Sequence, residues 1–145
     1  MPGTARLSAY VLAPRVDRPD VMLVGSRTGL SLLAREGRGW RFLKHVPGAP
    51  RYVRTIVTRP GGVAYLGTTF DGVVRLRLDD ATAPTTILAG ETQLRDIDGF
   101  NVTDAAGLPD GGLLVLERYF RWTTGVSMRV RRLLASSAPP VAARR

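Results

Sequence analysis

The sequence contains no cysteine, a single histidine and a single lysine among its 145 residues. The absence of cysteine excludes a disulfide framework, a thiolate metal site and a cysteine nucleophile. No apolar stretch approaches the roughly 20 residues that a membrane-spanning helix needs, so we expect no membrane partner. Residues 1–6 lack the apolar core of a secretion signal, and the sequence as it stands therefore predicts a cytoplasmic protein.

Long helical patterns are also missing. No segment of ten or more residues keeps a 3.6-residue apolar period without a glycine or proline inside it. The 16 glycines and 10 prolines favour short strands joined by many turns, because both residues weaken helix interiors. The composition therefore predicts an all-β protein, and a chain of this length is typical of one domain.

The charge is one-sided, with a net value of +9. Such an excess is typical of proteins that bind nucleic acid or an acidic partner. The basic residues are scattered along the chain, however, and the clearest internal cluster is Arg129, Arg131 and Arg132. On an alternating strand Arg129 and Arg131 share one face, which we expect to be solvated. The pattern argues against nucleic-acid binding.

The chain repeats itself. An apolar run, a glycine, a short turn and a second glycine occur at residues 21–30 and return at 64–73, with a looser copy from 113 to 126. Gly25 corresponds to Gly67, 42 positions later, and periods of about 40–50 residues are typical of four-stranded propeller blades. The sequence thus predicts an incomplete β-propeller of about three blades of antiparallel strands, forming a single domain over 1–134 before a disordered tail at 135–145.

The three blades are expected at about 7–43, 51–89 and 98–134. The predicted strands are Ala9–Leu12, Val21–Val24, Leu30–Leu33, Trp40–Leu43, Val53–Val57, Val63–Leu66, Val73–Leu78, Thr85–Leu88, Val102–Ala105, Leu113–Glu117 and Val126–Leu134. The third blade lacks a fourth strand. Because propellers close on themselves with four to eight blades, three blades leave exposed edges. We therefore expect a fragment that associates with adjoining propeller blades or with copies of itself.

Two families resemble parts of the chain. Residues 21–78 resemble the repeats of two-component regulator propellers, which act as sensors, through Val53–Val57, Pro60–Gly62, Tyr65–Thr68 and Asp71–Val73. Residues from about 98 to 133 resemble the esterase-like, phytase-like propeller family, through Gly99–Ala106, Leu108–Arg118, Phe120, Gly125 and Met128–Arg132. Tyr119 departs from the basic residue usual after that Glu-Arg pair.

The phytase-like resemblance implies a metal-assisted hydrolase of phosphate esters or esters, with calcium as the expected cofactor and a secreted or periplasmic location. It covers about a quarter of the chain and omits the rest of that propeller, so we expect a partial protein that is inactive in isolation. The alternative is a non-enzymatic binding or scaffolding propeller fragment, as the sensor-like repeats imply. In either case the expected ligand is a small molecule or a phosphate ester.

Glu117 and Arg118 are the candidate catalytic residues. They follow the apolar run Leu113–Leu116, where a carboxylate could bind a metal or transfer protons and an arginine could hold phosphate through two hydrogen bonds. The alternative is a Glu–Arg ion pair that fixes the end of the strand, or two solvated residues.

Asp98 and Asp104 are candidate metal ligands that would join Glu117 in a calcium site, since calcium prefers several oxygen ligands. Their spacing matches no dedicated calcium loop, and turn formation is the alternative role. His45 is expected in a loop between blades with no partner in view, and no serine nucleophile elbow is present.

Overall fold

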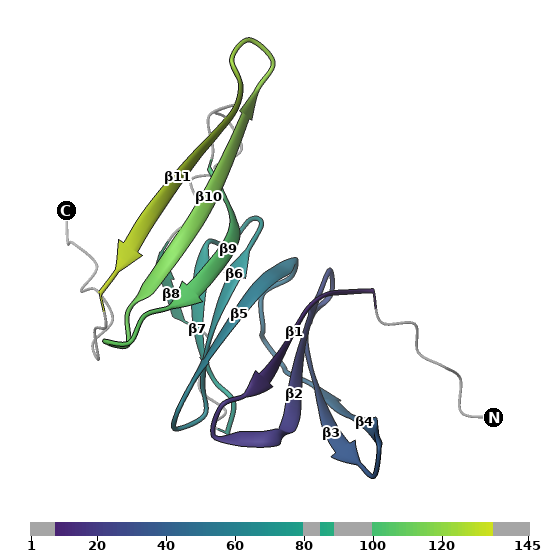
Figure 1. Ribbon diagram of the computed structural model, residues 1–145. Helices are drawn as coiled ribbons and strands as arrows, with labels where there is room; N and C mark the ends of the chain where they lie inside the picture. The colour runs from purple at the N-terminus through teal and green to yellow at the C-terminus, as the bar shows by residue number, and fades with distance from the viewer. Residues whose placement is uncertain (1–7, 80–84, 89–99, 135–145) are drawn as a thin grey trace.

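The computed structural model describes residues 8–79, 85–88 and 100–134, and every regular element in these residues is a β-strand (Figure 1). The strands are β1 (Ala9–Arg15), β2 (Arg18–Ser26), β3 (Gly29–Glu36), β4 (Gly39–His45), β5 (Val53–Arg59), β6 (Val63–Thr68), β7 (Val73–Arg77), β8 (Thr85–Leu88), β9 (Asn101–Gly107), β10 (Leu113–Arg121) and β11 (Gly125–Leu133). The described residues contain no helix that could cross a membrane. The predicted all-β class is confirmed, strand by strand.

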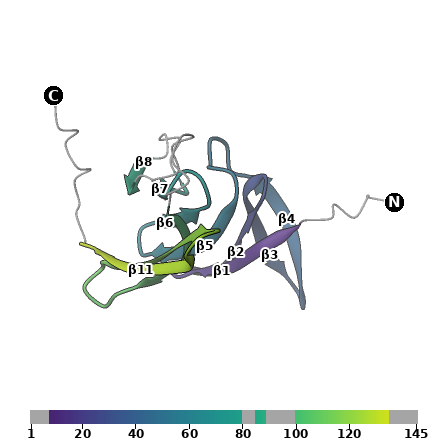
Figure 2. The same cartoon turned by 90° about the horizontal axis from the view of Figure 1, so that it is seen from above.

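The strands form three antiparallel sheets, each with its strands in sequence order. Sheet 1 contains β1 to β4, sheet 2 contains β5 to β8, and sheet 3 contains β9 to β11. The first strand of each sheet contacts the first strand of the next, β1 against β5 and β5 against β9. Sheet 2 therefore lies between the other two (Figures 1 and 2). The three predicted blades correspond to these three sheets. Closure with further blades or copies stays a prediction.

Each junction between sheets has its own apolar core. Leu23 and Leu30 of sheet 1 belong to the same buried cluster as Leu66 of sheet 2, which is the larger of the two. Val102 and Val115 of sheet 3 pack on sheet 2 in a smaller one. The described residues thus place most of the apolar burial between sheets 1 and 2.

The repeated glycine has a packing reason. A Cβ on Gly25 would lie 2.6 Å from Val11 of its own sheet and 2.8 Å from Val53 of the following sheet. A Cβ on Gly67 would likewise lie 2.3 Å from Thr55 of its own sheet and 2.7 Å from Val102 of the following one. Any side chain at these positions would push the next sheet away, so the repeat at 42 residues reflects the way one sheet approaches the next.

Sheet 3 leaves an apolar face uncovered among the described residues. Val126, Met128 and Val130 alternate along β11 and are more than half exposed, at 56, 58 and 63 %. The expectation that adjoining blades or a second copy cover such a face stays a prediction.

Candidate functional site

The first strand of every sheet carries a β-bulge close to its beginning. In β1 the register passes from Ala9 to Val11, which leaves Tyr10 as the extra residue. In β5 the register passes from Val53 to Thr55, so that Arg54 is the extra residue. In β9 it passes from Val102 to Asp104, so that Thr103 is the extra residue. A bulge redirects the extra side chain out of the regular alternation of the strand.

The three bulged residues meet at one cavity of about 570 Å³. Its lining is contributed by all three sheets: Ala9, Tyr10, Arg54, Thr69, Asn101, Val102, Thr103, Arg118 and Phe120. Three equivalent irregularities in three separate sheets therefore converge on the same space. This convergence identifies the cavity as the candidate site, since bulges are frequent beside functional sites.

The guanidinium of Arg54 is held by two contacts. Its Nε donates a hydrogen bond to Thr69 Oγ1 at 3.0 Å. Its Cζ lies 4.2 Å from the centre of the Tyr10 ring, a cation–π contact. These contacts leave the terminal nitrogens of the fork for another partner.

A long hairpin brings Arg118 to the cavity. In sheets 1 and 2 the central hairpin turns soon after Ser26 and Thr68, whereas in sheet 3 the β10–β11 ladder continues to the pair Arg121 and Gly125. Figure 1 shows this hairpin projecting beyond the other strands. The extension carries Arg118 and Phe120, both of which line the cavity.

Glu117 is not among the residues that line the cavity. Its side chain is fully buried, with 0 % of its surface exposed. Arg131 donates two hydrogen bonds of 2.7 and 2.9 Å to the Glu117 carboxylate, and Arg129 Nε donates a third at 2.7 Å. Burial by itself raises the pKa of Glu117, but the hydrogen bonds from Arg131 and Arg129 outweigh it and hold the pKa below its usual value. Glu117 therefore fixes the base of the hairpin as a buried anion.

The expectation that Arg129 and Arg131 face solvent is wrong. Both are about one-third exposed and lie across the ladder from β10, paired with Glu117 and Val115 respectively. The ion-pair alternative for Glu117 is thus the observed arrangement, with these two cross-strand arginines as partners. The predicted catalytic roles of Glu117 and Arg118 both stay predictions, and Arg118 lies at the cavity.

Two of the three residues predicted for the metal site, Asp104 and Glu117, have partners within the protein. Asp104 Oδ1 accepts a hydrogen bond from Thr55 Oγ1 at 3.1 Å, and both oxygens of Glu117 are occupied by arginines. Asp98 lies outside the described residues. Among the residues that the structure describes, no three histidine or acidic side chains gather at one point, and the calcium site that would include Asp98 stays a prediction.

His45 is the last residue of β4, not part of a loop. Its Nδ1 lies 2.8 Å from the hydroxyl of Ser31, and its ring packs edge-on against Phe42. Ser31 is buried at 1 % exposure. A buried hydroxyl of this kind is a hydrogen-bonded strand residue and is not placed to attack a substrate.

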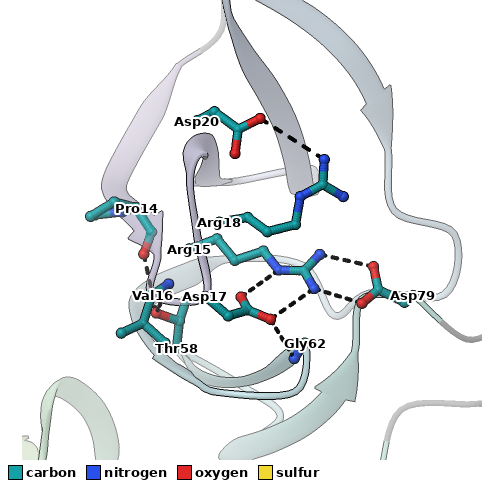
Figure 3. A network of polar contacts seen from close by, with 9 residues as sticks. All are labelled: Pro14, Arg15, Val16, Asp17, Arg18, Asp20, Thr58, Gly62 and Asp79. Carbon is teal, nitrogen blue, oxygen red and sulfur yellow. Dashed lines mark hydrogen bonds and ion pairs between the residues drawn. The ribbon is translucent and has the colours of Figure 1, made fainter.

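A contrasting polar cluster lies at the opposite end of the first strands. Arg15 ends β1 and is buried, and its guanidinium binds Asp17 and Asp79 through four hydrogen bonds of 2.6 to 3.1 Å (Figure 3). Asp17 also accepts a hydrogen bond from the backbone N–H of Gly62, at 3.1 Å. The cluster joins the β1–β2 turn of sheet 1 to sheet 2.

The ionisation of this cluster follows from its hydrogen bonds. The hydrogen bonds that Arg15 donates to Asp79 and Asp17 raise the pKa of Arg15 above its usual value. In turn, the hydrogen bonds from Arg15 lower the pKa of both Asp17 and Asp79. All three groups are therefore held in their charged forms, with one guanidinium between two carboxylates.

Comparison with known proteins identifies a family. A family model described as phytase-like, with the esterase-like activity of phytase, matches residues 50–145. The matched segment begins well before residue 98 and includes seven of the nine residues that line the cavity, all except Ala9 and Tyr10. No curated protein and no solved structure matches the chain. The resemblance of residues 21–78 to regulator propellers stays a prediction.

Proposed function

The chain belongs to the phytase-like family described by the esterase-like activity of phytase, and from this premise we propose that its cavity binds the anionic group of a phosphate ester. The observation that carries the proposal is the convergence of three bulged strands on one space that contains Arg54 and Arg118. The described lining includes no carboxylate that would neutralise these two cations.

The chemistry of the lining suits phosphate. A guanidinium presents its N–H groups in a planar fork that matches two phosphate oxygens, and such charge-assisted hydrogen bonds are stronger than neutral ones. Arg54 is already oriented by Thr69 and Tyr10, which reduces the ordering that binding requires. The hydroxyl of Thr103 and the Phe120 ring complete a site with polar and apolar parts.

Hydrolysis requires more than this lining supplies. A phosphate ester needs an activated water or nucleophile, and the described lining holds no carboxylate or imidazole to act as a base. We therefore propose binding without turnover by this chain in isolation. A metal-assisted reaction, with calcium held by Asp98 or Asp104, is the second candidate, which the family description favours.

Calorimetric titration with inorganic phosphate at low salt tests the binding proposal. The wild-type chain should bind, and Arg54→Ala or Arg118→Ala should each weaken affinity by about 10- to 100-fold, as expected for losing a charge-assisted contact. Arg38→Ala, in the β3–β4 turn, is the matched control and should change affinity little. Equal affinities in all four proteins would contradict the proposal.

Turnover is tested separately with p-nitrophenyl phosphate in the presence and absence of added calcium. Binding without release of p-nitrophenol under either condition is the expected result. Calcium-dependent release that Arg118→Ala abolishes would replace the binding proposal with the hydrolase.

A further inference from the structure

The long hairpin of sheet 3 carries an exposed aromatic pair next to the cavity. Phe120 lines the cavity and is half exposed. The centroid of its ring lies 5.5 Å from that of Trp122, and the two rings are inclined at 74°. Trp122 lies in the turn between β10 and β11, at the projecting end of the hairpin in Figure 1, and is 91 % exposed. The pair therefore extends the cavity wall outward and contributes little to the apolar core.

Two side chains of β11 widen this apolar surface. Met128 lies directly across the ladder from Arg118, and Val126 lies directly across from Phe120. Directly opposed side chains lie on the same face of a sheet, so both are on the face with which β10 lines the cavity. Both are more than half exposed. The hairpin therefore presents a cation and a group of apolar side chains on one face.

The order of residues along β10 relates this apolar surface to the proposed anion site. Arg118 and Phe120 are two residues apart on one strand, a separation of about 7 Å. An anion that binds Arg118 therefore places the group attached to it against Phe120 and, beyond that ring, Trp122. Adjoining exposed apolar side chains at the rim of a cavity are typical of a ligand-binding surface.

We propose that Phe120 and Trp122 make the cavity selective for phosphate esters of an aromatic alcohol. This inference rests on the proposed function, in which Arg54 and Arg118 bind the phosphate. The two rings are steeply inclined to each other, so they offer a further ring one face and one edge, which are the contacts that aromatic groups prefer. Binding also removes apolar surface of the ligand and of Trp122 from water, which a short alkyl ester cannot match.

Titration with phenyl phosphate and with methyl phosphate tests the inference. At about pH 8 both esters are dianions, because the second pKa of a phosphate ester is about 6, so they differ only in the alcohol. The wild-type chain should bind phenyl phosphate about tenfold more tightly. Phe120→Ala and Trp122→Ala should each reduce this preference by about threefold and leave the affinity for methyl phosphate unchanged.

Trp40→Ala is the matched control. Trp40 is a partly exposed tryptophan in β4, the edge strand of sheet 1, and this variant should keep the full preference. Phe120→Leu replaces Phe120→Ala if thermal unfolding shows that the alanine variant does not fold.

Tryptophan fluorescence gives a second readout. The chain contains two tryptophans, so Trp40→Phe leaves Trp122 as the single emitter. Phenyl phosphate should shift the emission of Trp122 to shorter wavelength, because its indole ring leaves water, whereas methyl phosphate should not. An unchanged emission maximum at saturating phenyl phosphate would overturn the inference.

The outcomes of the titrations separate the two proposals. Equal wild-type affinities for the two esters would overturn the selectivity and leave phosphate binding intact. A full preference in both Phe120→Ala and Trp122→Ala would also overturn it, because the aromatic ring would then bind elsewhere. Absence of binding by both esters and by inorganic phosphate would overturn the proposed function together with this inference.

Discussion

Arginines lie at both ends of the layer formed by the first strands β1, β5 and β9, and the two ends differ in what these arginines contact. At the finishing end, Arg15 binds two carboxylates and Arg59 Nη2 donates to the carbonyl oxygens of Leu108 and Gly112. At the starting end, Arg54 contacts a hydroxyl and a ring, and it shares with Arg118 a cavity whose described lining has no carboxylate. Arg15 and Arg59, whose partners belong to the protein, thus join neighbouring sheets. We propose that Arg54 and Arg118 bind a ligand instead.

The finishing end also shows how one sheet is joined to the next. Arg15 ends β1 and reaches sheet 2, and Arg59 ends β5 and reaches the β9–β10 turn of sheet 3. The last residue of β9 is Gly107, where a Cβ would lie 2.9 Å from Arg59 Nη2. Glycine at this position therefore admits the arginine of the preceding sheet.

The largest expected effect is that of Arg15→Ala on stability. Removing the buried guanidinium leaves Asp17 and Asp79 facing each other without a cation, and we expect a loss of about 2–3 kcal/mol in the free energy of unfolding. Urea denaturation measures the change. Phosphate affinity should stay at the wild-type value under folded conditions. A stability equal to that of wild type would remove the contrast between the two ends.

Glu117→Gln should have the next largest effect. The neutral amide leaves two partly buried arginines without their carboxylate, which should cost about 1–3 kcal/mol of unfolding free energy. Because Glu117 adjoins Arg118 at the base of the long hairpin, phosphate affinity should fall as well. The control is Arg118→Ala, which should lose phosphate affinity while its stability stays close to that of wild type. A Glu117→Gln protein with wild-type stability would contradict the structural role of Glu117 in the hairpin.

Arg59→Ala should cost less than Arg15→Ala. The substitution removes two hydrogen bonds to neutral carbonyl oxygens, and a loss of about 1–2 kcal/mol is expected. Urea denaturation of the two variants side by side measures the difference. A larger loss in Arg59→Ala would show that the smaller junction, between sheets 2 and 3, limits the stability of the chain.

The smallest effect concerns pH. Asp17 and Asp79 have lowered pKa values in the folded protein. Their contribution to the free energy of unfolding is therefore fully present above the pKa of an aspartate in the unfolded chain, about 4. It is lost as the pH falls through the pKa values of the folded protein. Wild-type stability should therefore decline below about pH 5. Arg15→Ala should show a shallower decline, measured as the urea midpoint between pH 3 and 7. Parallel pH profiles would contradict the ionic origin of the cluster.

The strands could be predicted well because their signals are local. Alternating apolar residues and a turn glycine identify a hairpin without reference to the rest of the chain, as Asp71-Gly72 does before β7, where Gly72 has a φ of 70°. The corresponding glycines Gly25 and Gly67 also indicated the repeat. The sequence does not reveal that Gly25 and Gly67 lie close to the first strand of the following sheet.

The site was harder to predict because it depends on register. Arg118 could be found from its place beside Glu117, but Arg54 looks like an ordinary strand residue until a bulge redirects it. The partners of Glu117 were missed since Arg129 and Arg131 lie 12 and 14 residues away, and the apolar residues between them suggested the opposite orientation. Arg129 and Arg131 lie on the more buried face of β11, which reverses the usual pattern of charged residues on the exposed face. The carboxylate of Glu117 on the neighbouring strand explains this orientation.

The central claim is that the starting end of the first strands, rather than the finishing end, receives an anion. Titration of the ¹⁵N-labelled chain with inorganic phosphate, followed by amide chemical shifts, tests it most directly. The account predicts saturable shifts at Tyr10, Arg54 and Arg118 and their neighbours, with the amides around Arg15 and Gly62 unchanged. Shifts centred on Arg15, or shifts spread evenly over the arginines without saturation, would contradict it.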